Sequence, residues 1–168
     1  QGMFAHIGVY YSKHFGLNVS QIGLVLLMAG AGSVAGTVAG GRLADVLGKK
    51  TVITFASIVT AAGVFGVSLV KESFMLALLF HLLWSTAYGC GQSALNALVS
   101  ELDPDLRGTE LALNSTAMYA GMVTATAASA VLLQAGTFVA IGIVSALSAL
   151  IVLPIVEYIV RQNKHLQY

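Results

Sequence analysis

The chain has 168 residues, of which 57% are hydrophobic and only 9% are charged. Soluble domains carry about 25% charged residues, so the composition excludes an ordinary water-soluble domain. A net charge of +1 and a single cysteine, Cys90, exclude a basic nucleic-acid-binding surface and an internal disulfide framework. A transmembrane helix needs about 20 apolar residues, so the chain is predicted to be an all-α polytopic membrane protein.

The first apolar stretch, residues 3–11, is too short to cross a bilayer and is followed by polar residues. It is typical of the last turns of a helix, and the first residue of the chain is Gln rather than Met. We therefore expect the chain to be a fragment that begins inside its first helix, with a partial helix at residues 1–14.

Four longer apolar runs follow, and the last of them is long enough for two helices. A turn at residues 134–137, with a helix-ending glycine, divides this last run. The chain is therefore expected to form a single helical bundle, because helices satisfy their own backbone hydrogen bonds in lipid. The expected spans are residues 20–41, 52–70, 74–99, 109–133 and 138–160, followed by a polar tail at 161–168.

Cations gather in alternate polar breaks, which places them on one side of the predicted membrane. Residues 41–51, 100–107 and 161–168 together hold six of the eight Lys and Arg residues. The positive-inside rule therefore predicts that these segments, including the C-terminus, lie in the cytoplasm of a multi-pass protein of the inner or plasma membrane.

Residues 41–50 read Gly-Arg-Leu-Ala-Asp-Val-Leu-Gly-Lys-Lys and join two apolar runs by a short turn at Gly48. The Asp45 carboxylate is placed where it can cap a nearby helix N-terminus. This decapeptide resembles the signature loop of the major facilitator superfamily, G-x-L-A-D-x-x-G-R/K-R/K. Val46 departs from the pattern, because a basic residue commonly follows the Asp. Residues 17–23 resemble the family's entry into the helix before this loop, and residues 101–109 resemble the family's next cytoplasmic connection.

The resemblance implies a transporter of twelve helices in two six-helix halves, of which this chain would be one half with a truncated first helix. Residues 74–99 lack Arg and residues 109–133 lack Pro, which the amino-terminal half commonly carries in the corresponding helices. The resemblance therefore favours the carboxy-terminal half. It also implies alternating access, with the first loop helping to close the cytoplasmic side. The expected residues of this conformational switch are Gly41, Arg42, Asp45, Gly48, Lys49, Lys50, Glu101 and Arg107.

Small residues recur at a four-residue spacing at Gly32, Gly36 and Gly40. Such a stripe lets two membrane helices approach closely. Two interpretations stay open, namely static packing, which we favour, and a sliding contact between the two halves during transport.

Two predicted helices carry polar and aromatic residues on one face. Polar groups at membrane depth usually face other protein segments or a water-filled path rather than lipid. By the resemblance they are helices ten and eleven, which line the central cavity, although ordinary core packing explains the pattern about as well. His81 shares the first face but lies nearer the outer end, where we expect it to contact water. The candidate cavity residues are Trp84, Tyr88, Gln92, Asn96, Asn114, Met118 and Tyr119.

The carboxylates all lie near predicted interfaces, so an acidic relay for proton coupling is expected in the other half. Glu101, Asp103 or Asp105 can pair with the basic first loop as a latch on the inner face. Gly91-Gln92-Ser93 resembles a nucleophile turn but has no nearby base, and the scattered His and Cys residues lack metal-ligand spacing. We therefore expect no enzyme activity, no cofactor, no metal and no nucleic-acid partner.

The predicted function is secondary active transport of a small neutral or amphipathic organic solute, with proton-coupled drug or sugar efflux as the family-level expectation. Mid-membrane Arg or Lys, which a strongly anionic solute would need, is absent. The expected partners are the lipid bilayer, a small-molecule substrate, and the other six-helix half or a second copy. Two alternatives remain: a half-size protein acting as a homodimer, and a membrane assembly partner that transports nothing.

Overall fold

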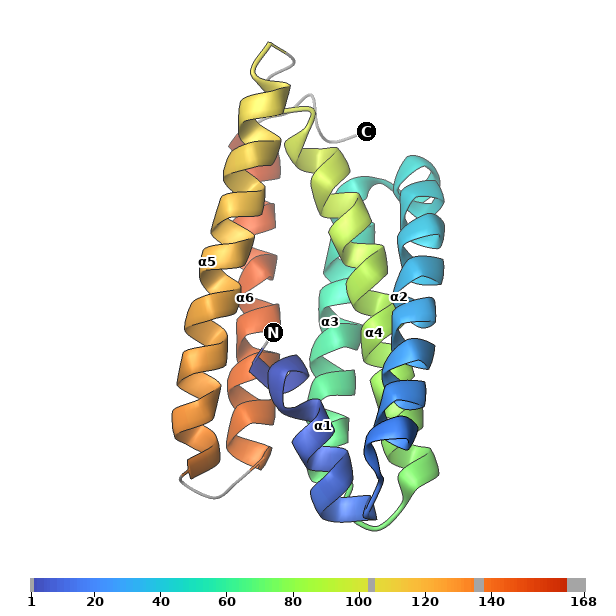
Figure 1. Cartoon of the computed structure of the whole chain (residues 1–168). Helices are drawn as coiled ribbons and strands as arrows, with labels where there is room; N and C mark the ends of the chain where they lie inside the picture. The colour runs from blue at the N-terminus through green and yellow to red at the C-terminus, as the bar shows by residue number, and fades with distance from the viewer. Residues whose placement is uncertain (1, 103–104, 135–137, 163–168) are drawn as a thin grey trace.

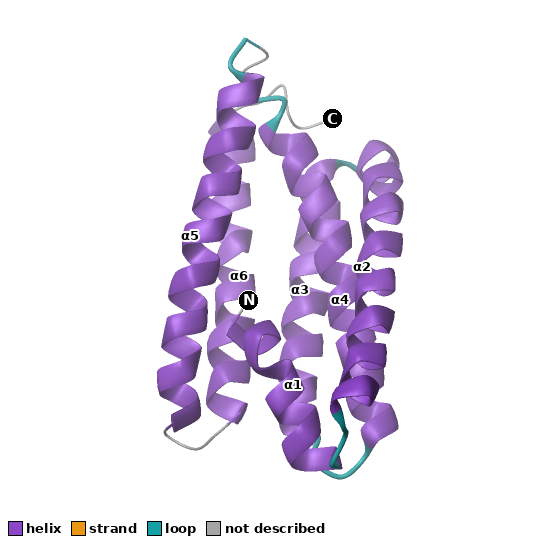
Figure 2. Ribbon diagram, viewed as in Figure 1, coloured by secondary structure: helices purple, strands orange, loops and turns teal. Residues whose placement is uncertain are grey.

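The computed structural model describes residues 2–102, 105–134 and 138–162, and these residues form helices and the connections between them (Figures 1 and 2). No strand occurs in these ranges, and five helices, α2 to α6, are long and apolar enough to cross a membrane. The all-α membrane bundle predicted from the sequence is confirmed. The helices are α1 Gly2–Phe15, α2 Val19–Leu47, α3 Lys49–Leu69, α4 Phe74–Val99, α5 Arg107–Gln134 and α6 Phe138–Gln162.

Helix α2 begins with a capping box formed by Asn18 and Gln21. The Asn18 side chain accepts a hydrogen bond from the Gln21 backbone N–H, and the Gln21 side chain accepts one from the Asn18 N–H, both at 3.0 Å. These bonds satisfy two backbone donors that the first helical turn leaves without partners. The start of α2 is therefore fixed by local sequence, in the segment that resembles the family's entry into this helix.

Helix α2 extends beyond the predicted end of its span at residue 41 and continues to Leu47. Gly48 alone separates it from α3, with a φ of 84° that favours glycine. The signature segment is thus helical on both sides of a one-residue break. The structure does not support Asp45 as a cap of α3, because the N-terminus of α3 at Gly48 has no side-chain cap hydrogen bond.

Helix α4 is the centre of the bundle. It packs along both α2 and α3, and α3 in turn packs along α6. Helix α5 makes far fewer contacts, and Ser129 is its one buried residue among those described. Figure 1 shows α5 and α6 beside each other, with the short α1 crossing the lower end of the bundle. Most of the surface of α5 is therefore left for lipid or for another protein segment.

Glycines bring α2 and α4 into backbone contact. A Cβ atom built on Gly36 would collide with the Thr86 backbone, and one built on Gly40 would collide with the Cys90 backbone. At Gly32 the Cβ would lie 2.9 Å from the Thr86 hydroxyl oxygen. The three glycines thus pack α2 against α4 within this chain, whereas a sliding contact with another half stays a prediction.

Helix α1 is well packed, although it is shorter than the other helices. Met3, Ile7, Tyr10 and Tyr11 are fully or almost fully buried. The Tyr10 hydroxyl donates a hydrogen bond to the carbonyl oxygen of Val70, at the end of α3. Helix α1 therefore belongs to the core at the end of the bundle where α3 ends and α4 begins.

Candidate solute cavity

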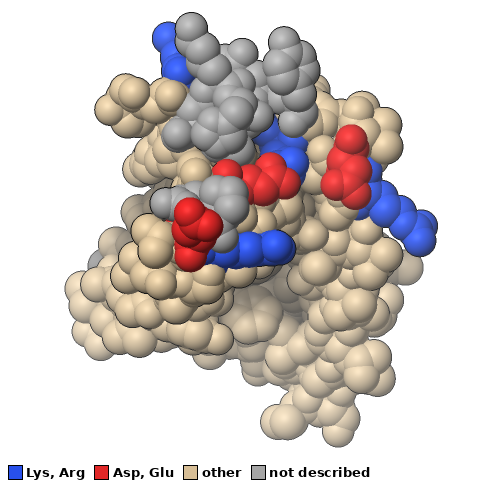
Figure 3. All heavy atoms as spheres, turned by 90° about the horizontal axis from the view of Figure 1, so that it is seen from above, with Lys and Arg blue, Asp and Glu red and all other residues tan. Residues whose placement is uncertain are grey.

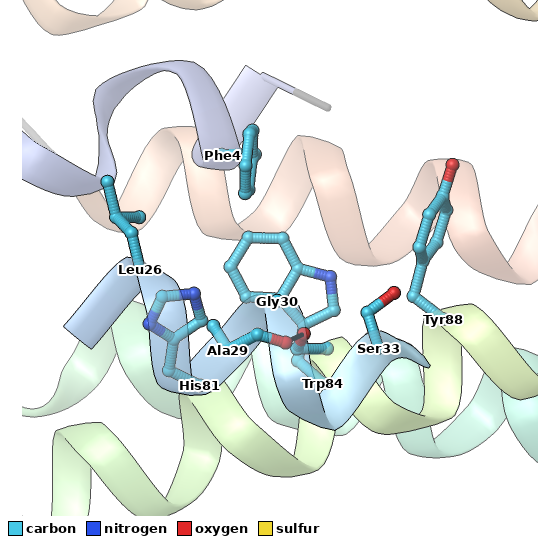
Figure 4. A pocket seen from close by; sticks show the side chains of 9 residues that line it. Phe4, Leu26, Ala29, Gly30, Ser33, His81, Trp84 and Tyr88 are labelled. Atoms are coloured by element: carbon cyan, nitrogen blue, oxygen red, sulfur yellow. Dashed lines mark hydrogen bonds between the residues drawn. The ribbon is translucent and has the colours of Figure 1, made fainter. Parts of the chain in front are cut away.

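A cavity of about 290 Å³ lies between α1, α2 and α4. Figure 4 shows side chains from these helices around the central Trp84 ring. Aromatic rings and hydroxyl groups line the cavity, and Lys, Arg, Asp and Glu are absent from its lining. The lining residues are Phe4, Leu26, Ala29, Gly30, Ser33, His81, Trp84, Ser85 and Tyr88.

Trp84 is held between two other rings. The Phe4 ring lies edge-on to it, with ring centroids 6.5 Å apart, and the His81 ring stacks on it with centroids 5.2 Å apart. Edge-on and offset-stacked arrangements are the favoured geometries of aromatic pairs. Both Trp84 and Tyr88, which are predicted from the sequence as cavity residues, line this cavity.

His81 is buried, with only 1% of its surface exposed, so the expectation that it contacts water is wrong. Its Nδ1 atom is hydrogen-bonded to the Tyr11 hydroxyl at 3.2 Å, and the two rings stack with centroids 5.8 Å apart. The reason is tertiary, because side chains of α1 cover the N-terminal part of α4 and exclude water from the ring. Together, Tyr11 and His81 join α1 to the cavity wall.

Hydroxyl groups also connect the two long helices beside the cavity. The Ser85 hydroxyl of α4 donates to the Ala29 carbonyl oxygen of α2, and both residues line the cavity. A hydroxyl donating to a main-chain carbonyl is satisfied without any charged partner, which suits an environment that excludes water. The α2–α4 wall is therefore both closely packed and hydrogen-bonded.

The predicted amide residues form a separate cluster between α4 and α5. Asn96 accepts hydrogen bonds from Gln92 at 3.4 Å and from Asn114 at 3.1 Å. Gln92 also lines a second cavity of about 220 Å³ between α1, α3, α4 and α6. Met118 and Tyr119 lie on α5 outside both cavities, and Tyr119 is 59% exposed. A solute contact at these residues stays a prediction.

Ion pairs gather at the end of the bundle that carries the α2–α3 turn, and Figure 3 shows this charged end face. Lys49 pairs with Glu101 at 2.9 Å, so the predicted contact between the first loop and the next loop on this side exists. Glu157 pairs with Lys50 at 2.5 Å and with Arg161 at 2.8 Å.

The remaining predicted switch residues do not join these ion pairs. Arg42, Asp45 and Arg107 are exposed and take part in none of the salt bridges found within residues 2–102, 105–134 and 138–162. Gly41 is half-buried and faces the Ser93 side chain of α4. Asp103 lies outside the described residues, so its predicted pairing stays a prediction.

The sequence pattern did not single out Phe4, which lines the cavity, or Tyr11, which contacts the cavity residue His81. The sequence predicts residues 1–14 to be the remainder of a truncated helix and assigns no function to them. The sequence does indicate that this helix packs against others. Its large apolar residues recur at the spacing of one helix face, at Met3, Ile7 and Tyr10 or Tyr11. That pattern identifies a packed helix, although it does not say which helix it packs against.

The fold defines the chain as a multi-pass membrane protein, in which three helices line a cavity without Lys, Arg, Asp or Glu. The sequence profile of the Major Facilitator Superfamily matches residues 2–166, and the chain therefore belongs to this family. The resemblance found in the signature loop is thereby confirmed.

Two proteins of Bacillus subtilis (strain 168) are similar to the chain. The uncharacterized MFS-type transporter YceJ is 29% identical over 131 residues, which are 78% of this chain and 33% of YceJ. The putative metabolite transport protein YwtG is 28% identical over 123 residues, which are 73% of this chain and 27% of YwtG. The chain thus matches about a third of the length of these curated relatives.

Proposed function

We propose that the chain is the carboxy-terminal half of a secondary active transporter, and that the cavity between α1, α2 and α4 contacts the transported solute. The observation that carries this proposal is an aromatic and hydroxyl-lined cavity inside a helix bundle of the Major Facilitator Superfamily. The names of the two relatives, which both refer to transport, support the same function.

The lining of the cavity favours a neutral or amphipathic organic solute. Trp84, His81 and Phe4 offer ring faces and edges to apolar groups, whereas Ser33 and Tyr88 offer hydroxyls to polar groups. A charged solute would lose its hydration on entering this cavity and would find no opposite charge there. That is unfavourable in a low-dielectric site. Sugars and amphipathic drugs combine apolar faces with polar groups and fit this chemistry. We propose that the transporter exports such a solute in exchange for protons.

Alternating access gives the charged end a role in this proposal. The Lys49–Glu101 pair ties the start of α3 to the segment after α4, so it holds the inner end of this half as a unit. Asp45 and Arg42 are exposed in the last turns of α2, where charged groups of another half can reach them. We propose that these contacts close the cytoplasmic side, in agreement with the positive-inside orientation.

Transport into everted membrane vesicles tests the solute class. Labelled sugars, amphipathic drugs and inorganic phosphate would be compared with and without a proton gradient. We expect uptake of a neutral or amphipathic solute and none of phosphate. Trp84→Ala should lower kcat/KM about tenfold, because one aromatic contact is worth about 1.5 kcal/mol. Leu79→Ala is the matched control, since Leu79 lies on the same helix, is 61% exposed and lines no part of the cavity.

Direct binding gives an independent test of the same cavity. Trp84 is the only tryptophan among these 168 residues. In a variant with any tryptophan outside them replaced by phenylalanine, the fluorescence of Trp84 reports on the cavity without a label. The transported solute should change this emission in a saturable way. Transport of phosphate, or equal kinetics in the Trp84→Ala and Leu79→Ala variants, would contradict the proposal. A cross-linked homodimer that transports the solute would support the half-size alternative, and the absence of any transport would support the assembly-partner alternative.

A further inference from the structure

An apolar groove of about 370 Å³ runs between α2 and α3, with α4 as its floor. It exists because α2 and α3 both pack along α4 but contact each other far less. Leu43 and Leu47 line one side, Phe55 and Val59 the other, and Leu83 the floor. No charged residue lines it, and Phe55 is 65% exposed. The groove is therefore an open apolar channel on a membrane helix surface.

A basic pocket of about 410 Å³ lies at the end of the same helices. Lys49, Lys50 and Arg161 line it together with a single carboxylate, that of Glu157. Glu157 is paired with Lys50 and Arg161, whereas Lys49 is paired with Glu101, which lies outside the lining. The lining thus has an excess of positive charge.

Arg161 retains donors for a further anion. Its hydrogen bond to Glu157 uses Nε, and its side chain is 76% exposed. The remaining N–H groups of a guanidinium can bind a phosphate in a bidentate manner, and Lys50 adds an ammonium beside them. Phosphate oxygens would compete with the Glu157 carboxylate for these donors.

The groove and the pocket adjoin each other, because Leu47 and Thr51 line both. These two residues flank the one-residue break at Gly48. An apolar channel therefore leads to a cationic pocket at the charged end of the bundle, which Figure 3 shows from above. This arrangement matches a molecule with an apolar chain and an anionic head.

We propose that the groove and pocket form a binding site for an anionic phospholipid, with one acyl chain in the groove and the phosphate at Lys50 and Arg161. Basic pockets at the ends of membrane helices are the sites that recognise anionic head groups. Free phosphate would use the pocket alone, so the adjoining groove favours the lipid. The site is separate from the solute cavity and does not depend on the proposed transport.

Native mass spectrometry of the full-length protein in detergent tests the site. Palmitoyl-oleoyl phosphatidylglycerol would be titrated against phosphatidylcholine with the same chains and against inorganic phosphate. We expect phosphatidylglycerol to bind with a distinct stoichiometry and phosphatidylcholine to bind at least tenfold more weakly. Equal binding of the two lipids would overturn head-group recognition, and displacement of phosphatidylglycerol by millimolar phosphate would overturn the role of the groove.

Variants separate recognition from folding. Each surface cation contributes about 1 kcal/mol to anionic lipid binding, so Lys50→Gln with Arg161→Gln should weaken phosphatidylglycerol about 30-fold. Glu157→Gln should tighten it about fivefold, because it removes the competing carboxylate. Weaker or unchanged binding in Glu157→Gln would overturn the proposal even if the double variant folds poorly.

Two further variants serve as controls for position. Lys71→Gln changes a cation in the turn between α3 and α4, at the opposite end of the bundle, and should leave phosphatidylglycerol affinity unchanged. Phe55→Ser alters the groove and should weaken phosphatidylglycerol several-fold. If Lys71→Gln lowers the phosphatidylglycerol affinity as much as the Lys50→Gln and Arg161→Gln double variant does, only net charge matters and the site is overturned. An unchanged affinity in Phe55→Ser would also overturn it.

Discussion

Substitution of Gly36 by alanine tests the close contact of α2 with α4. The added Cβ would lie 2.9 Å from the Thr86 carbonyl carbon and 3.1 Å from its Cα, whereas an ordinary contact is 3.4–4 Å. The Thr86 carbonyl oxygen would be closer still. Because all of these atoms belong to the backbone of a packed helix, no side-chain rotation relieves the overlap, and the two helices must separate.

The expected loss is about 2 kcal/mol of unfolding free energy. Overpacking costs about 1–3 kcal/mol, and separation also weakens interhelical hydrogen bonds, such as that from Ser85 to Ala29, worth about 0.6 kcal/mol each. The better helix propensity of alanine returns about 1 kcal/mol. The net effect is therefore smaller than the overlap alone implies, but it is well above the error of an unfolding experiment.

Reversible unfolding in detergent–denaturant mixtures, followed by circular dichroism, measures this change. Gly23→Ala is the matched control, because Gly23 lies on the same helix and a Cβ there meets no atom within 4 Å. Gly23→Ala should be neutral or stabilising by up to about 1 kcal/mol. Equal stability of the Gly36→Ala and Gly23→Ala proteins would refute the packing argument.

Three other predictions concern the cavity wall and the charged end. Tyr11→Phe keeps the ring stack but removes the hydrogen bond to His81, so the free energy of unfolding should fall by about 0.6 kcal/mol. An unchanged midpoint of the unfolding transition would show that this hydrogen bond is not stabilising. Asp45→Lys should lower transport at least tenfold with an unchanged melting temperature, and wild-type transport would argue against the switch. A double-mutant cycle on Lys49→Gln and Glu101→Gln should give a coupling below about 1 kcal/mol, because Glu101 is half-exposed, and a larger value would indicate a stronger latch.

Composition and run length were sufficient to predict the spanning helices, because lipid requires long apolar segments with an internally bonded backbone. Helix ends were harder to place. The sequence predicts that the first full span ends at residue 41, where charged residues begin, whereas α2 continues to Leu47. Charged residues are compatible with helix at a membrane interface, and only the positive φ at Gly48 interrupts it.

The cavity was predictable only in part. Trp84 and Tyr88 were found because they lie four residues apart on a polar, aromatic helix face. Phe4, Tyr11 and the burial of His81 depend on where α1 crosses α4, which no local pattern encodes. The family resemblance rested on the first loop, whereas the pairing of Lys50 with Glu157 required the position of α6 against α3.

Water access at Tyr88 tests the central claim most directly. In a Cys90→Ser background, Tyr88→Cys would be treated with a membrane-impermeant maleimide, and Leu79→Cys on the outer surface of the same helix would serve as the reference. The account predicts labelling of Tyr88→Cys that the transported solute slows, and no labelling of Leu79→Cys. Labelling at Leu79→Cys with none at Tyr88→Cys would place the cavity face in hydrocarbon and contradict the account.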